Sequence, residues 1–117
     1  LDEGYGSPEM VEFALKQKLS NLPRLTNKDN KRLYELCDIL SEVEAVKEDE
    51  KYAALLSYFD SSAGILPVLK KLPHSIQEKW KNHAVNYKKK QNVTFPPFSV
   101  LVEFMREISR VWNDPSF

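Results

Sequence analysis

The segment "LYELCDILSEV", Leu33–Val43, decides the fold of this chain. Its apolar residues recur every three or four positions, the spacing that gathers side chains on one face of an α-helix. They are Leu33, Leu36, Cys37, Leu40 and Val43, with Ile39 beside them. The same stripe resumes after the charged run "KEDEK", at Tyr52, Leu55, Leu56 and Phe59. We predict two helices with a break near residues 47–50, because one uncapped helix of about 33 residues is unusual in a small domain.

The segment before this stripe predicts another helix. Ser7 can accept a hydrogen bond as an N-cap, Pro8 suits the first helical position, and Glu9 favours the positive end of the helix dipole. The apolar positions that follow at helical spacing are Val11, Ala14, Leu15, Leu19 and Leu22. Pro23 ends this helix. We expect Thr26 or Asn27 to cap the helix that contains Leu33–Val43, with Asp29 in its first turn.

The second half of the chain is divided by prolines and polar turns. "DSSAG", residues 60–64, predicts a turn, and "ILPVLKKL" predicts a short helix with Pro67 near its start and Pro73 after its end. We expect Ser75 to cap the next helix, and Pro97 or Ser99 to open the last one after the extended segment "FPPF". The inward positions of these two helices are Ile76, Trp80, His83 or Ala84, and Tyr87, and then Leu101, Phe104, Met105, Ile108 and Trp112.

Together these patterns predict an all-α fold. No stretch shows a sustained alternation of apolar and polar residues, and three glycines are few for a fold with many tight turns. The 117 residues suit one domain, 42% of them are apolar, and 29% are charged, as is typical of soluble globular proteins. We therefore expect residues 1–117 to form a single compact bundle of five or six short helices.

The charges are distributed unevenly although the net charge is zero. Residues 1–60 contain 13 acidic and 8 basic residues, whereas residues 61–117 contain 4 acidic and 9 basic residues, so the halves carry −5 and +5. Such halves suit either internal pairing or head-to-tail contact between copies. No apolar run approaches the length of a membrane span, and the acidic start "LDEGYG" is unlike a signal peptide. We expect an intracellular, cytoplasmic protein without membrane contact.

Residues for catalysis or metal binding are few. Cys37, His74 and His83 have no recognised zinc spacing. Cys37 lies on an apolar helical stripe, where cysteine is usually a small core residue. The glycines form no phosphate-binding loop. We expect no enzyme activity, no metal or cofactor, and no small-molecule substrate.

A basic segment offers the main alternative. Its lysines are Lys70, Lys71, Lys79, Lys81, Lys88, Lys89 and Lys90. Trp80, Tyr87 and Phe95 are interleaved with them, and lysines with aromatic residues can bind phosphates and stack on bases. The interpretation we favour is a solvated helix face over buried aromatics, because Trp80 and Tyr87 fall on the inward stripe. The basic segment contains no arginine, which also weakens the case for bidentate phosphate recognition.

Several motifs, in this order, resemble the Gag segment of BEL/Pao-type LTR retrotransposons. They are "LDEGYGSPEMVEFALKQKLSNLP", "LYELCDILSEV", "LPVLKKLPHSIQEKW" and "NDPSF". Their order and spacing extend the resemblance over nearly the whole chain, from residue 1 to residue 117. The resemblance implies a structural, self-assembling protein similar to the helical C-terminal domain of retroviral capsids, and a domesticated descendant is compatible with it. The chain departs from the family at Gly4, where a basic residue is common, and it shows neither a major homology region nor a zinc knuckle.

The leading hypothesis is accordingly a Gag-like capsid domain that associates with copies of itself, as homodimers or larger capsid-like assemblies. The candidate self-association surface comprises Leu55, Tyr58, Phe59 and Trp80, next to the basic segment. Two alternatives stay open, namely a helical module that binds RNA through Lys70–Lys90, and a helical adaptor that holds a partner helix in a groove.

Overall fold

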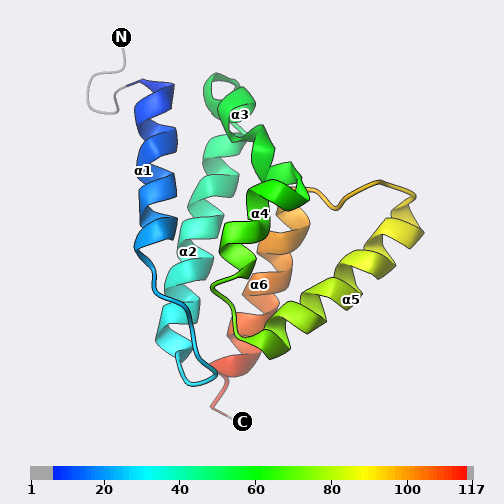
Figure 1. Ribbon diagram of the computed structural model, residues 1–117. Helices are drawn as coiled ribbons and strands as arrows, with labels where there is room; N and C mark the ends of the chain where they lie inside the picture. Colours follow the sequence, from blue (N-terminus) through cyan, green and yellow to red (C-terminus); the bar gives the residue numbers. More distant parts are fainter. Residues whose placement is uncertain (1–6, 116–117) are drawn as a thin grey trace.

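The computed structural model of the protein describes residues 7–115, and Figure 1 shows their arrangement. Over these residues the chain forms six α-helices and one 3₁₀ helix, without any strand. The all-α prediction is therefore confirmed. The elements are α1 (Pro8–Asn21), α2 (Asn30–Lys47), α3 (Glu50–Leu56), the 3₁₀ helix η1 (Ser57–Asp60), α4 (Ser62–Leu69), α5 (His74–Gln91) and α6 (Phe98–Trp112). The start "LDEGYG" and the end of "NDPSF", both used in the family resemblance, lie partly or wholly outside the described residues.

Helix α2 forms the centre of the core. It packs against α1, α3 and α6, and its five predicted stripe residues are all buried. Burying one leucine side chain stabilises the fold by about 1.5–3 kcal/mol, so this stripe is a main source of stability. One continuous core cluster draws on every helix of the described chain.

Both ends of α1 agree with the prediction. The Ser7 side chain accepts a hydrogen bond from the Met10 amide at 3.2 Å, and the helix ends at Asn21, shortly before Pro23. Leu15 and Leu19 are buried, whereas Ala14, which shares their helical spacing, is exposed. The buried face of α1 is therefore narrower than the sequence pattern indicates.

The predicted start of α2 is wrong. The helix begins at Asn30 with Asp29 as the N-cap residue, rather than at Thr26 or Asn27. The Asp29 carboxylate turns back and accepts hydrogen bonds from the Thr26 amide at 2.8 Å and the Thr26 hydroxyl at 3.0 Å. These bonds lower the pKa of Asp29 and close the connection between α1 and α2 before the helix starts.

The predicted break after α2 is confirmed. Helix α2 ends at Lys47, and Asp49 opens α3 by accepting a hydrogen bond from the Lys51 amide at 3.0 Å. Helix α4 begins at Ser62, earlier than expected, because the Ser61 hydroxyl accepts a hydrogen bond from the Gly64 amide at 3.2 Å. Pro67 consequently lies inside α4, not near its start.

The N-terminal ends of α5 and α6 both follow prolines. Helix α5 begins at His74 directly after Pro73, so the predicted cap at Ser75 is wrong. Helix α6 begins at Phe98 with Pro97 as its N-cap residue, one of the two predicted positions. Since proline has no side-chain acceptor, neither helix has a local side-chain cap.

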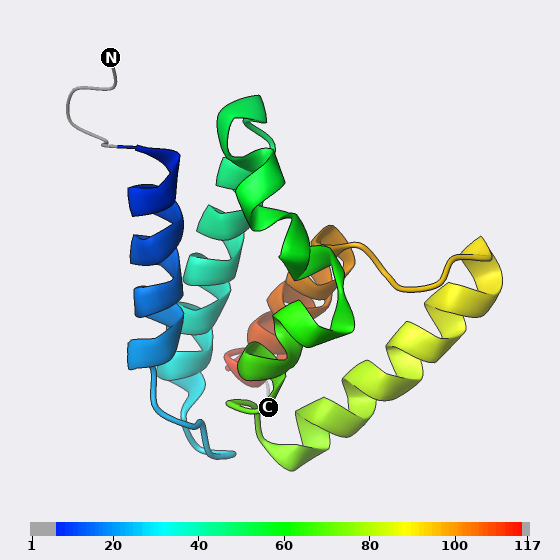
Figure 2. The same ribbon diagram turned by 45° about the horizontal axis from the view of Figure 1, so that its top comes forward.

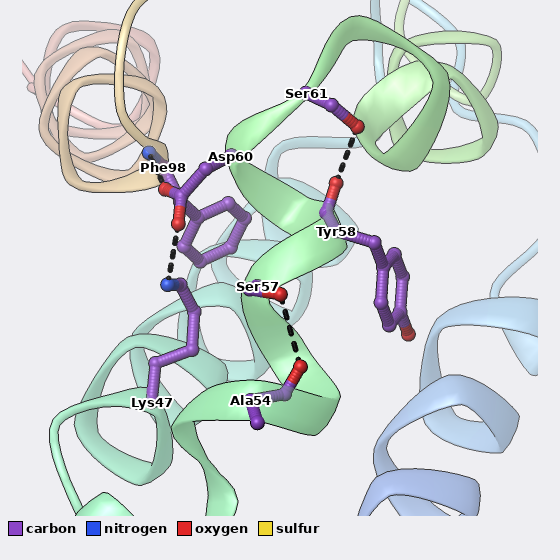
Figure 3. Close-up of polar contacts among 7 residues, drawn as sticks. All are labelled: Lys47, Ala54, Ser57, Tyr58, Asp60, Ser61 and Phe98. Carbon is purple, nitrogen blue, oxygen red and sulfur yellow. Dashed lines mark hydrogen bonds and ion pairs between the residues drawn. The ribbon is translucent and has the colours of Figure 1, made fainter.

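Asp60 provides the acceptor that α6 lacks locally (Figure 3). Its Oδ1 atom accepts a hydrogen bond from the Phe98 amide at 2.7 Å, while its Oδ2 atom accepts one from Lys47 Nζ at 2.8 Å. One carboxylate therefore links η1 to the end of α2 and the beginning of α6.

Helix α5 projects from the rest of the molecule, as Figure 2 shows. Its first half packs inward through Ile76, Trp80 and Ala84, but no residue of α5 beyond Ala84 is buried. The helix ends at Gln91, its C-cap residue Asn92 has a left-handed φ of 54°, and residues 93–97 return the chain to α6. The second half of α5 is thus an arm with solvent on most sides.

The described residues contain no single helix that is long and apolar enough to cross a membrane. The stretches Glu50–Asp60 and Ser62–Leu69 reach the length and apolar composition of a membrane span only when taken together, and a bend of 75° separates them.

Candidate association surfaces

Two of the four residues predicted for self-association are in the core. Phe59 is 2% exposed and Trp80 is 4% exposed. The Phe59 ring lies 5.1 Å from the ring of Phe98, and the Trp80 ring lies 5.3 Å from that of Phe104, measured between centroids. The prediction is wrong for these two residues, because their apolar surface is already buried within one copy.

The other two residues, Leu55 and Tyr58, are half-buried. The Tyr58 hydroxyl donates a hydrogen bond to Glu12 Oε2 at 3.4 Å, and Lys16 Nζ lies 5.0 Å from the centre of the Tyr58 ring. Burial and the Glu12 carboxylate both raise the pKa of Tyr58. Tyr58 therefore fastens η1 to α1 within the molecule.

Lys71 also has an internal role that its sequence did not reveal. Its Nζ atom donates hydrogen bonds to the carbonyl oxygens of Ser20, at 3.3 Å, and of Leu22. Its carbonyl oxygen accepts a hydrogen bond from the Leu25 amide at 2.7 Å. Lysine near a helix C-terminus commonly satisfies such free carbonyls, so Lys71 caps α1 instead of joining a basic surface.

The remaining lysines of the basic segment extend over the outside of the molecule. Lys70, Lys79, Lys81, Lys89 and Lys90 are exposed, and Lys88 is half-buried. Lys81 pairs with Glu78 at 3.4 Å. Lys88, Lys89 and Lys90 form the last turn of α5, where positive charge favours the negative end of the helix dipole. Trp80 is buried, as the interpretation of a solvated lysine face over buried aromatics requires, but Tyr87 is only half-buried.

The sequence did not predict a groove between α5 and α6. This α5–α6 groove has a volume of about 480 Å³. Its lining residues are His83, Tyr87, Ser99, Val100, Glu103, Phe104, Glu107 and Ile108. At one end the rings of Trp80, His83 and Phe104 contact one another, with centroids 5.3–5.9 Å apart. The groove exists because α5 diverges from α6, which a helical repeat cannot indicate.

An apolar surface on α1 was also missed. Met10 is 64% exposed and Phe13 is 59% exposed, the highest values for large apolar side chains among the described residues. Successive residues of an α-helix are about 100° apart, which places both side chains opposite Leu15. Together with Gln17 they form the α1 outer face. Its signal in the sequence is a pair of apolar residues three positions apart that does not fit the Leu15–Leu19 stripe.

Cys37 is buried as predicted for a core cysteine. Its thiol donates a hydrogen bond to the Met105 carbonyl oxygen at 3.2 Å, and burial raises the pKa of the thiol to about 11. The Ser109 hydroxyl lies beside it and opposes the shift in part, but makes no hydrogen bond of normal geometry. His74 and His83 are both exposed. Within residues 7–115, no three His, Cys, Asp or Glu side chains are placed to hold a metal ion.

Comparisons with protein-family models, curated proteins and solved structures find no match to this chain.

Proposed function

We propose that this chain is a structural self-association module of a Gag or capsid-like protein, retrotransposon-derived as its sequence resemblance implies, with a second copy as its partner. It acts without catalysis, cofactor or small-molecule substrate, inside the cell. The observation that carries the proposal is an uncovered apolar face on α1 together with an open, partly apolar groove between α5 and α6. Neighbouring exposed apolar side chains are a common feature of protein interfaces.

Sedimentation velocity and light scattering of the 117-residue chain, from micromolar to millimolar concentration, test this proposal. We expect the average mass to rise with concentration, because burial of Met10 and Phe13 removes apolar surface from water. A mass that stays at that of one copy over the whole range contradicts the proposal.

RNA binding is the second candidate function. The observation in its favour is the lysine-rich last turn of α5, at the tip of the arm that projects into solvent. Single-stranded RNA should then bind with an affinity that falls steeply as salt is raised. Replacing Lys88, Lys89 and Lys90 with Glu should abolish this binding.

A matched control replaces two exposed lysines at the beginning of α2 and in the preceding connection, Lys28→Glu and Lys31→Glu. Equal losses of RNA affinity in both variants would indicate a general charge effect. Absent or salt-insensitive binding by the unmodified chain would rule out this function.

A further inference from the structure

We infer that copies of this chain associate head to tail, with the α1 outer face of one copy seated in the α5–α6 groove of the next. The inference rests on the proposed self-association and specifies which two surfaces meet. It names different surfaces from those predicted from the sequence, since Phe59 and Trp80 are buried.

The α1 outer face has the form of a ridge. Met10, Phe13 and Gln17 recur at helical spacing and point away from the Leu15 and Leu19 side of the helix. The aromatic and thioether side chains at the N-terminal end can enter a concave surface, and methionine adapts readily to irregular gaps. Binding of a single helix through its apolar face in an apolar groove is a recurring mode of protein recognition.

Acidic residues gather at the N-terminal end of this ridge, whereas Lys16 and Lys18, further along α1, pair with Glu12 and Glu42. Glu9 is exposed in the first turn of α1, and Glu48 and Glu50 are exposed around the start of α3, which packs against α1. Figures 1 and 2 both place the beginning of α1 next to α3. These three carboxylates form the acidic corner of the molecule.

The α5–α6 groove provides the complementary surface. Tyr87, Val100, Phe104 and Ile108 give it an apolar lining. Lys88, Lys89 and Lys90 follow Tyr87 directly along the arm, so one rim of the groove ends in three positive charges. The other rim, on α6, carries two acidic residues that would repel the acidic corner.

These acidic residues of the α6 rim restrict the orientation of the seated helix. Glu107 pairs with Arg110, while Glu103 remains exposed in the groove lining. The acidic corner of the neighbouring copy should therefore lie over the tip of α5, and not over α6. Charges at an interface commonly set the orientation of the partners in this way.

The two surfaces lie on opposite sides of one copy. Helices α2 and α6 separate α1 from α5 in Figure 1, and the view in Figure 2 agrees. A contact between two different surfaces is heterologous, so each added copy leaves a new free surface for the next one. Head-to-tail contact would therefore yield rings or extended assemblies. The charges of −5 on residues 1–60 and +5 on residues 61–117 also favour contact between the first half of one copy and the second half of the next.

Two variants separate the two surfaces. The ridge variant carries Met10→Ser and Phe13→Ser, and the groove variant carries Lys88→Glu, Lys89→Glu and Lys90→Glu. Each change lies at exposed or half-buried positions, and circular dichroism checks that the helices are retained. We expect each variant alone to associate at least about tenfold more weakly than the unmodified chain.

The mixture of the two variants gives the decisive result. The ridge variant keeps an intact groove and the groove variant keeps an intact ridge, so together they should form a dimer of one copy of each and grow no further. A control with Tyr34→Ser and Val111→Ser, which alters exposed apolar residues outside the proposed contact, should associate like the unmodified chain.

A charge reversal adds a second readout. Glu9→Lys, Glu48→Lys and Glu50→Lys should weaken association alone, and should restore it when introduced into the groove variant. If the unmodified chain associates and both variants do so equally well, the interface lies elsewhere and only this inference fails. If the ridge variant and the groove variant each associate weakly but form no mixed dimer, that result also contradicts the head-to-tail contact. A strictly monomeric unmodified chain would instead overturn the proposed function itself.

Discussion

A Cβ atom at Gly64 would lie 1.8 Å from the carbonyl oxygen of Tyr58 and 2.6 Å from its carbonyl carbon. The first turn of α4 thus packs directly on the backbone of η1, and backbone atoms cannot move aside as a flexible side chain can. We expect Gly64→Ala to lower the free energy of unfolding by about 3 kcal/mol, the upper range for an overpacked site. Urea denaturation measures the change.

The neighbouring position gives a matched control. Ala63→Ser adds one atom at an exposed position of the same turn, and should change the free energy of unfolding by less than about 0.5 kcal/mol. Equal stability of Gly64→Ala and the unmodified chain would show that η1 and α4 are not packed this closely.

The Cys37 thiol leads to a prediction of pH dependence. Its folded-state pKa of about 11 is above the ordinary value of 9.0, so the unfolded chain loses this proton at lower pH than the folded one. The contribution of the neutral thiol to the free energy of unfolding is fully present below pH 9 and is lost as the pH rises towards 11. We expect this loss to reach roughly 2–3 kcal/mol.

Cys37→Ala serves as the reference for this measurement, because other groups also titrate in alkali. The difference in unfolding free energy between the two proteins should shrink by that amount between pH 8 and pH 11. The folded protein should also react slowly with a thiol reagent at neutral pH. A constant difference, or rapid labelling of the folded chain, contradicts a buried neutral thiol.

Individual residues also show where sequence reasoning succeeds and fails. The Ser7 cap and the buried stripe of α2 were predicted correctly, because local spacing and local hydrogen bonds determine them. The cap of α2 was misassigned because the Thr26 hydroxyl donates a hydrogen bond to the Asp29 carboxylate. The sequence alone does not show whether Thr26 makes this bond or caps the helix.

The start of α6 depends on an element distant in sequence. Asp60 in η1 accepts from the Phe98 amide, so Asp60→Ala should remove both the cap and the Lys47 bond and lower the unfolding free energy by about 2 kcal/mol. Asp60→Asn retains an oxygen for the Phe98 amide and should cost about half as much. Thermal denaturation compares them with Asp38→Ala, a change at an exposed acidic residue of α2. Equal effects of Ala and Asn at position 60 would argue against the cap.

The end of α1 offers a comparison between adjacent lysines. Lys71→Met removes the donor to the Ser20 and Leu22 carbonyls, and should lower the unfolding free energy by about 1–2 kcal/mol. Lys70 is exposed at the end of α4, so Lys70→Met should have little effect. Equal stabilities of the two variants, measured in urea, would show that Lys71 is an ordinary surface residue. No sequence signal distinguishes the two lysines, since the helix that Lys71 caps is far away in the chain.

At the scale of the whole molecule, the arm formed by the second half of α5 should be the least stable helix segment. No residue after Ala84 in α5 is buried, whereas α2 contributes five buried residues to the core. Amide hydrogen exchange should therefore show opening of residues 85–91 at least about tenfold more often than of residues 74–80, with α2 slowest. Uniform protection along α5 would show that the arm is fixed by contacts beyond those described.

The general architecture was predictable, but the shape of the surface was not. Periodicity and prolines predicted an all-α bundle and most helix boundaries within a few residues. The angle at which α5 leaves α6 depends on which side chains pack between them, and the α5–α6 groove follows from that angle. Trp80 was therefore assigned to an association surface although it is buried against Phe104, while Met10 and Phe13 were not considered.

The bonds between Lys71 and the end of α1 also bear on how the chain folds. Lys71 Nζ reaches the Leu22 carbonyl across 49 residues of sequence. Closing a loop of that length costs roughly 3 kcal/mol of chain entropy, so these bonds should form after the local turns of α1 and α2. Because these bonds form late in folding, a substitution at Lys71 should accelerate unfolding more than it slows folding.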